Sequence, residues 1–71
     1  MVYTAADVEM ANRHVAQGER HIVQQEGIIS RLLLRGLPTG EAEDMLEELR
    51  VTLTQHRDHR TIMVSSRGGE A

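Results

Sequence analysis

Histidine is the residue type with the most chemical scope in this sequence, and its four copies have helical spacings. His14 and His21 are seven residues apart, and His56 and His59 are three apart. Residues three apart share one face of a helix and can bind one ion together, whereas seven residues of helix separate two side chains by about 10.5 Å. A pairing of His14 with His21 on one ion is therefore excluded for a straight helix.

One hypothesis is a metal site for zinc or another transition metal, built from His21, His56 and His59. Zinc takes four protein ligands in a structural site and three plus water in a catalytic one. The set would be completed by Glu19, Glu26 or a residue of a second chain. The spacing His-Arg-Asp-His is no specific zinc signature, and the Glu-x-x-His pair of di-iron bundles is missing from the sequence.

Two other interpretations of the histidines stay open. They can serve as polar residues between helices, hydrogen-bonded to one another or to nearby Glu and Arg side chains. They can also form a pH-sensitive interface, because the charge of histidine changes near neutral pH. The first interpretation needs no metal, and no cofactor is then expected.

Catalytic arrangements are not found elsewhere in the sequence. There is no Cys, no glycine-rich phosphate loop and no nucleophile elbow. Ser30, Ser65 and Ser66 have no His and Asp context that would activate a hydroxyl. Two helices alone enclose no pocket, so we predict a protein that is not an enzyme.

Composition excludes two classes of partner. The net charge is −3 and the only aromatic residue is Tyr3, so a basic surface and stacking residues for nucleic acid are missing. No apolar run approaches the roughly 20 residues of a membrane span. The first residues lack the basic region and apolar core of a signal peptide. We expect no nucleic acid, no membrane and a cytoplasmic location.

The histidines require elements that position them, and apolar periodicity predicts two helices. In the first, about 4–35, Thr4 is the expected N-cap with Asp7 as its capping-box partner. One heptad position, as in a coiled coil, holds Val8, Val15, Ile22 and Ile29. The companion position is weaker and holds Ala11, Gly18, Gln25 and Leu32.

A turn is predicted at 36–40, because Gly36 suits the residue after a helix end and Pro38 prevents continuation. The second helix, about 41–64, begins with acidic residues and repeats Ala42, Leu46, Leu49 and Leu53. Its charges, acidic near the turn and basic at the far end, predict a solvated face or a docking surface. Residues 65–71 have no pattern and are expected to form a disordered tail.

The short turn makes the helices antiparallel neighbours. If the chain reverses near Pro38, residues pair across the hairpin when their numbers add to about 76. This register predicts Ile22 opposite Leu53 and His21 opposite His56, with His14 between His59 and Met63. Four imidazoles then gather in the half of the hairpin away from the turn.

The fold class is therefore all-α, an antiparallel two-helix hairpin in a single domain. Near the turn the first helix is apolar on nearly all sides, which is more than one returning helix can cover. We expect two hairpins to form a homodimeric four-helix bundle. The predicted interface consists of Ile28, Ile29, Leu32, Leu33, Leu34, Leu37, Met45, Leu46, Leu49 and Leu53.

Two segments carry a resemblance to a group of short, uncharacterised alphaproteobacterial proteins. The first is Arg13-His14-Val15-Ala16-Gln17-Gly18-Glu19-Arg20-His21-Ile22, which resembles the group's H-x-x-x-G-E-R-H-I helix. The second is His56-Arg57-Asp58-His59-Arg60, which resembles its H-R-x-H-R helix. The resemblance implies a helical hairpin of unknown function and assigns no catalytic or binding residue.

Together these observations predict a small non-enzymatic module for protein–protein interaction or regulation, acting as a homodimer or bound to a larger protein. One variant of this hypothesis is an inhibitor that covers the surface of another protein. The alternative from a different class is a histidine-based, metal-binding helical bundle.

Overall fold

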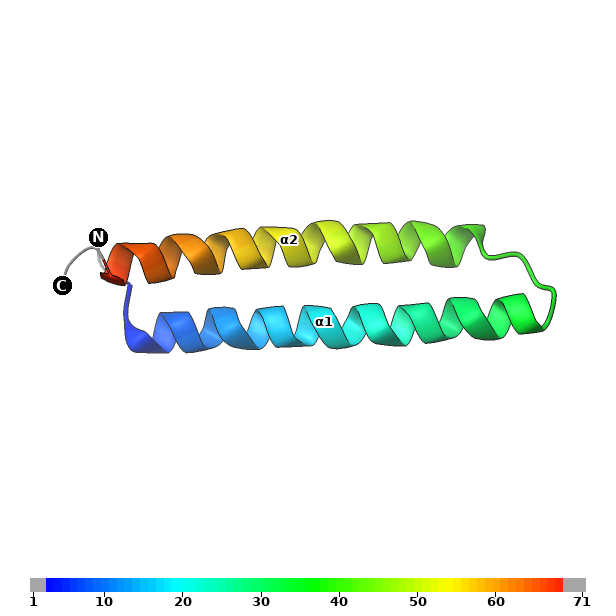
Figure 1. The fold of residues 1–71 in the computed structure, drawn as a ribbon, viewed down its shortest axis with the longest axis horizontal. Helices are drawn as coiled ribbons and strands as arrows, with labels where there is room; N and C mark the ends of the chain where they lie inside the picture. Colours follow the sequence, from blue (N-terminus) through cyan, green and yellow to red (C-terminus); the bar gives the residue numbers. More distant parts are fainter. Residues whose placement is uncertain (1–2, 69–71) are drawn as a thin grey trace.

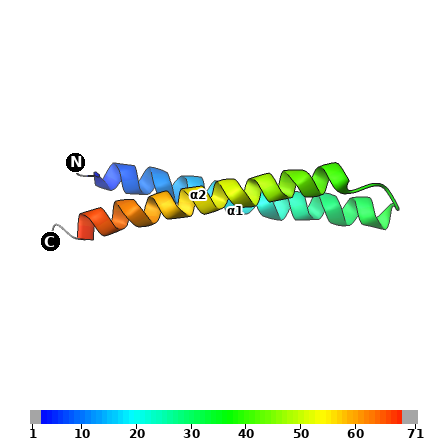
Figure 2. The same ribbon diagram turned by 90° about the horizontal axis from the view of Figure 1, so that it is seen from above.

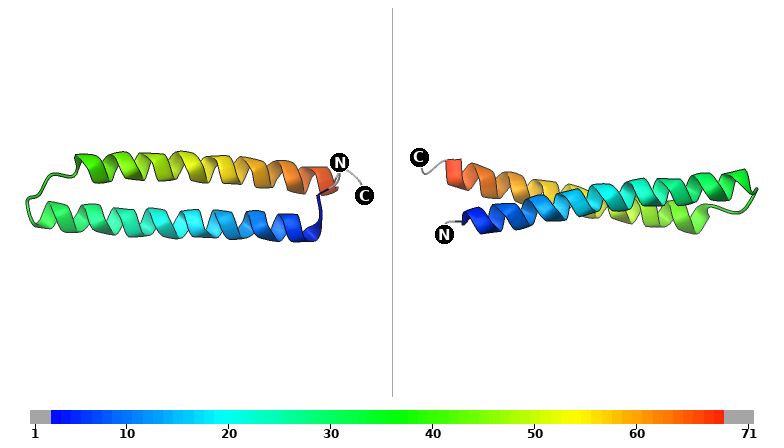
Figure 3. Two further views of the ribbon diagram at one scale, coloured as in Figure 1. Left: turned by 180° about the vertical axis from the view of Figure 1, so that it is seen from behind. Right: turned by 90° about the horizontal axis from the view of Figure 1, so that it is seen from below.

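The structure, a computed structural model, describes residues 3–68 as two long helices packed side by side in opposite directions (Figure 1). Helix α1 spans Ala5–Leu34 and helix α2 spans Gly40–Gly68. The start of α1 and the end of α2 lie at the same end of the hairpin, opposite the turn (Figures 1 and 3). No strand occurs in residues 3–68. The predicted all-α antiparallel hairpin is confirmed.

The start of α1 follows the predicted capping box. The Asp7 N–H donates to the Thr4 hydroxyl at 3.1 Å, and the Thr4 N–H donates to the Asp7 carboxylate at 2.9 Å. Two N–H groups that no helical carbonyl can reach are thereby satisfied. The boundary at Ala5 is within one residue of the predicted one.

The end of α1 is a Schellman turn centred on Gly36. The N–H of Leu37 donates to the Leu32 carbonyl at 2.9 Å, and the N–H of Gly36 donates to the Leu33 carbonyl at 3.0 Å. Gly36 has a φ of 67°, in the left-handed region that glycine adopts without a steric penalty. The chain therefore reverses at Gly36, and α1 projects beyond the start of α2 at the turn (Figure 1).

This reversal corrects the predicted register. The chain reverses at Gly36, two residues before Pro38. The numbers of residues that face each other across the seam therefore add to about 72 and not to 76, a shift of about four residues. A Cβ placed on Gly18 would lie 3.0 Å from Leu53 Cδ1, so Leu53 packs against Gly18 rather than directly opposite Ile22. Asn12 and Arg60 share the new register, with a hydrogen bond of 3.4 Å from the Arg60 guanidinium to the Asn12 side-chain oxygen.

Helix α2 also continues further than predicted. Residues 65–68, which were expected in a disordered tail, form its last turn, and 69–71 lie outside the described residues. Arg67 lies in this turn and its guanidinium donates to the Tyr3 carbonyl at 2.8 Å. This contact, together with the burial of Met63, ties the end of α2 to the beginning of the chain.

The core is a single line of side chains between the two helices, which cross at a shallow angle near their middles (Figures 2 and 3). The half-buried Gln25 in this line donates from its side-chain amide to the Ala42 carbonyl at 2.9 Å, so its polarity is satisfied. Among the described residues the buried apolar side chains are Ala11, Val15, Leu46, Leu53 and Met63.

Substituting Gly36→Ala tests the importance of the reversal. We expect the free energy of unfolding to fall by about 1 kcal/mol, because alanine is strained at a positive φ. The matched control is Gly27→Ala, in the middle of α1, where a new Cβ meets only Arg31 Nη1 at 3.7 Å. That change should raise the stability by up to about 1 kcal/mol. Equal shifts of the two urea midpoints would contradict the role given to Gly36.

Candidate functional site

Three of the four histidines line one hollow beside the helix seam. The hollow has a volume of about 230 Å³ and lies on the side of the hairpin that we call the histidine face. Gly18 contributes backbone to its lining, and Leu53 occupies the space that a Gly18 side chain would take. Its lining residues are His14, Gln17, Gly18, His21, Leu49, Thr52 and His56.

The closest imidazoles across the seam belong to His14 and His56. Their ring centroids are 5.1 Å apart and the rings are tilted by 48°. The predicted partner of His56 was His21, so this pairing is corrected by the same shift of register that moved Leu53. His56 is half-buried and His14 is exposed, so one edge of the pair remains open to solvent.

His59 has a different neighbour. Its ring lies edge-on to the ring of Tyr3, with centroids 6.1 Å apart and an interplanar angle of 86°. Edge-to-face geometry is favourable for aromatic rings because the positive ring edge meets the negative face. Tyr3 was used in the sequence analysis only to exclude partners. No local pattern indicates this contact, because Tyr3 precedes the first helix.

The proposed ligands His21, His56 and His59 do not come together as one cluster. His21 and His56 share the hollow and His59 does not line it. Within residues 3–68, no group of three His, Asp or Glu side chains is close enough to hold a metal ion. Glu19 and Glu26, the suggested additional ligands, are engaged in ion pairs elsewhere.

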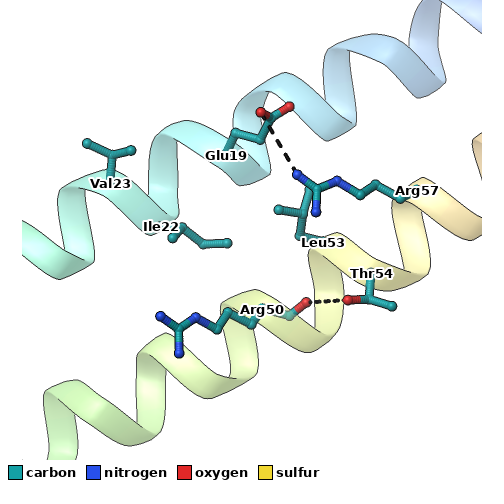
Figure 4. A pocket seen from close by; sticks show the side chains of 7 residues that line it. All are labelled: Glu19, Ile22, Val23, Arg50, Leu53, Thr54 and Arg57. Atoms are coloured by element: carbon teal, nitrogen blue, oxygen red, sulfur yellow. Dashed lines mark hydrogen bonds and ion pairs between the residues drawn. The ribbon is translucent and has the colours of Figure 1, made fainter.

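The opposite side of the seam is a charged face (Figure 4). Arg50 Nη2 lies 3.7 Å from Glu26 Oε2, and Arg57 Nη2 lies 4.0 Å from Glu19 Oε2. All four side chains are about half exposed, so each pair contributes less than about 1 kcal/mol. Three of them, Glu19, Arg50 and Arg57, line a shallow groove of about 480 Å³ together with Ile22, Val23, Leu53 and Thr54.

The predicted interface residues divide into three groups by exposure. Leu46 and Leu53 are buried inside the hairpin, and Ile29, Leu32 and Leu49 are half-buried in the seam. The other five are exposed around the turn, and Leu34 is the most open at 88%. We call this exposed set the turn-end surface: Ile28, Leu33, Leu34, Leu37 and Met45.

Comparison with known proteins adds no family to this geometry. No protein-family model, curated protein or solved structure matches the chain. The resemblance to alphaproteobacterial hairpin proteins therefore stays a prediction. In the described part of the chain, neither helix has a stretch both long and apolar enough to cross a membrane.

A double-mutant cycle tests the observed histidine pairing. The stability changes of His14→Ala and His56→Ala should be non-additive by about 0.5–1 kcal/mol, because the two rings lie against each other across the seam. The control cycle, His14→Ala with His59→Ala, should be additive within about 0.5 kcal/mol, because His59 lies outside the hollow and against Tyr3. A larger coupling in the control cycle would favour the register predicted from the sequence.

Proposed function

We propose that this chain is a small, non-enzymatic helical interaction module of the cytoplasm that works in assembled form. The assembly is a homodimer, in which two hairpins make a coiled-coil-like four-helix bundle, or a complex with a larger protein. The observation that carries the proposal is the turn-end surface, on which five large apolar side chains remain exposed.

The thin core supports this proposal. Five apolar side chains are buried between residues 3 and 68, and no buried polar network reinforces them. Domains of this size depend on disulfides, a metal or association to become stable. The sequence contains no cysteine, so disulfides are excluded. Association would supply the apolar burial that one hairpin cannot provide for itself.

The position of the exposed residues supports it further. Leu33 is 64% exposed and Leu34 is 88% exposed, on adjacent positions of the last turn of α1. Isolated exposed leucines are ordinary, but several large apolar side chains exposed at one end of a small protein usually mark an interface. Met45, near the start of α2, and Leu37 in the connection are also exposed at this end of the hairpin.

The second candidate function is a metal-binding helical bundle, favoured by the proximity of His14 and His56. This pair offers two imidazole ligands in place of the three from the predicted set. A second chain would supply the remaining ligands that zinc requires.

Native mass spectrometry of the tag-free protein decides between the two candidates. An interaction module should show only whole-chain masses after dialysis against a dilute zinc salt. A mass excess of one ion per dimer, abolished by His56→Ala and retained by His59→Ala, would make the metal-binding bundle the better proposal.

The turn-end surface is tested by substitutions to glutamate. Leu34→Glu and Leu33→Glu should abolish retention of a partner protein on the immobilised chain, because a carboxylate is costly to bury in an apolar contact. Val51→Glu is the matched control, since Val51 is 49% exposed on α2 away from the turn. Circular dichroism should show equal helicity for all variants. Retention of the same protein by Leu34→Glu would show that the turn end is not its docking surface.

A further inference from the structure

The histidine face carries one stripe of residues from each helix. On α1 the stripe repeats at steps of four and three residues, so its members lie on one side of the helix. On α2 a stripe with the same steps contains Thr52, which lines the hollow together with His14, Gln17 and His21. The α1 stripe is Met10, His14, Gln17, His21, Gln24, Ile28 and Arg31. The α2 stripe is Ile62, His59, Gln55, Thr52, Glu48, Met45 and Glu41.

The two stripes match each other in chemistry when they are read in opposite directions. Apolar residues stand opposite apolar residues at both ends, and the cation stands opposite an anion. The outer members of the stripes are the pairs Met10 and Ile62, Gln17 and Gln55, Gln24 and Glu48, and Arg31 and Glu41. In each pair the two residue numbers add to 72, as they do in the Asn12–Arg60 contact inside the hairpin, so the two residues lie at the same level along its length.

These outer pairs cannot form inside one chain. The outer positions lie one step further from the seam than His14 or Thr52, on the two flanks of the hairpin. Met10 is accordingly 50% exposed and Ile62 is 56% exposed. Both become covered if α1 of a second hairpin lies over α2 of the first and runs antiparallel to it.

The match also fixes the direction of the two-fold axis. An axis along the length of the hairpin places α1 over α2 of the second copy at the same level, so Met10 meets Ile62 and Arg31 meets Glu41. An axis across the length would place Met10 near Arg31 and Ile62 near Glu41. That second arrangement would bury apolar groups against charges, which is unfavourable.

The charged face does not offer an equivalent surface. Covering it would remove water from four charged side chains whose ion pairs are 3.7 and 4.0 Å long. The centre of the histidine face, between Ile28 and His14, contains no residue with a permanent charge in its inner positions. Hydroxyl and amide groups, which carry no charge, cost less to cover than paired ions.

The size of the surface is sufficient for a stable dimer. The Cα trace measures 55 by 15 by 13 Å. One long face of these dimensions is comparable to the roughly 800 Å² per partner that a standard protein interface buries.

We propose that a second copy of this chain packs on the histidine face, with the two-fold axis along the hairpin and both turns at the same end. This inference rests on the proposed function and names the surface through which the homodimer forms. All neighbouring helices in the resulting bundle are antiparallel. The turns of the two copies lie side by side, Ile28 and Met45 of the turn-end surface enter the interface, and the imidazoles of both chains meet in the middle of the bundle.

A matched pair of substitutions on α2 tests which face is used. Ile62→Glu places a charge in the proposed interface, and Val64→Glu places one on the other side of the same helix turn, where Val64 is 50% exposed. Sedimentation equilibrium of tag-free protein in EDTA should show a dimer dissociation constant at least about tenfold higher for Ile62→Glu. The constant of Val64→Glu should change less than about threefold. The reverse order would overturn the proposal and indicate the charged face.

A charge exchange tests the orientation. Arg31→Glu and Glu41→Arg each place like charges opposite one another in their own homodimer. When the two variants are mixed, both contacts in the heterodimer become attractive, so the mixture should dimerise more tightly than either variant alone. Any weakening of the individual hairpins is common to homodimer and heterodimer. A mixture that behaves as the average of the two variants would overturn the proposed axis.

The outcomes separate this inference from the proposed function. A wild-type chain that remains monomeric at every concentration overturns the histidine-face dimer. It leaves the larger-partner form of the proposed function to be decided by Leu34→Glu, because Leu34 does not belong to either stripe.

Discussion

The left-handed conformation of Gly36 is the constraint on which the other contacts depend. Only two helices are present in residues 3–68, so one reversal sets every cross-helix contact. The Schellman hydrogen bonds fix that reversal two residues before Pro38. Leu53 consequently fills the space beside Gly18, and His14 lies beside His56. The hollow, the imidazole pair and the division into two faces are all consequences of this register.

Local patterns were sufficient to predict the hairpin. Heptad spacing, the Thr4–Asp7 cap and the Gly36-x-Pro38 break each act within a few residues, and each determines structure at its own position. Register is different, because it depends on where between two turn residues the chain reverses. Gly36 was recognised as the residue after the helix end, but the reversal was centred on Pro38. An error of two residues there shifts the contacts along the seam, such as Gly18 with Leu53, by about one helical turn, whereas the ion pairs Glu19–Arg57 and Glu26–Arg50 on the charged face still add to 76.

The candidate site could likewise be predicted only where local patterns determine it. Clustering of histidines beside a weak seam follows from their spacing and from Gly18, and the structure brings three of them to one hollow. The contacts of Tyr3 with His59 and with Arg67 join residues more than fifty positions apart, so no local pattern contains them. The helical turn at 65–68 lies beside one of these contacts. The sequence of this turn has no apolar periodicity, which is why it was predicted to be part of a disordered tail.

The two faces of the hairpin differ in the free-energy cost of removing water from them. This difference favours association through one face over association through the other. The charged face holds its ions in pairs that water already solvates, so covering it returns little energy. The histidine face has few charges, apolar residues at both ends and a hollow that another side chain can enter. Imidazole has a polar edge that can face water in the isolated hairpin and an apolar ring surface that can be covered in an assembly. A face of this composition is compatible with both states, which a leucine-rich face would not be.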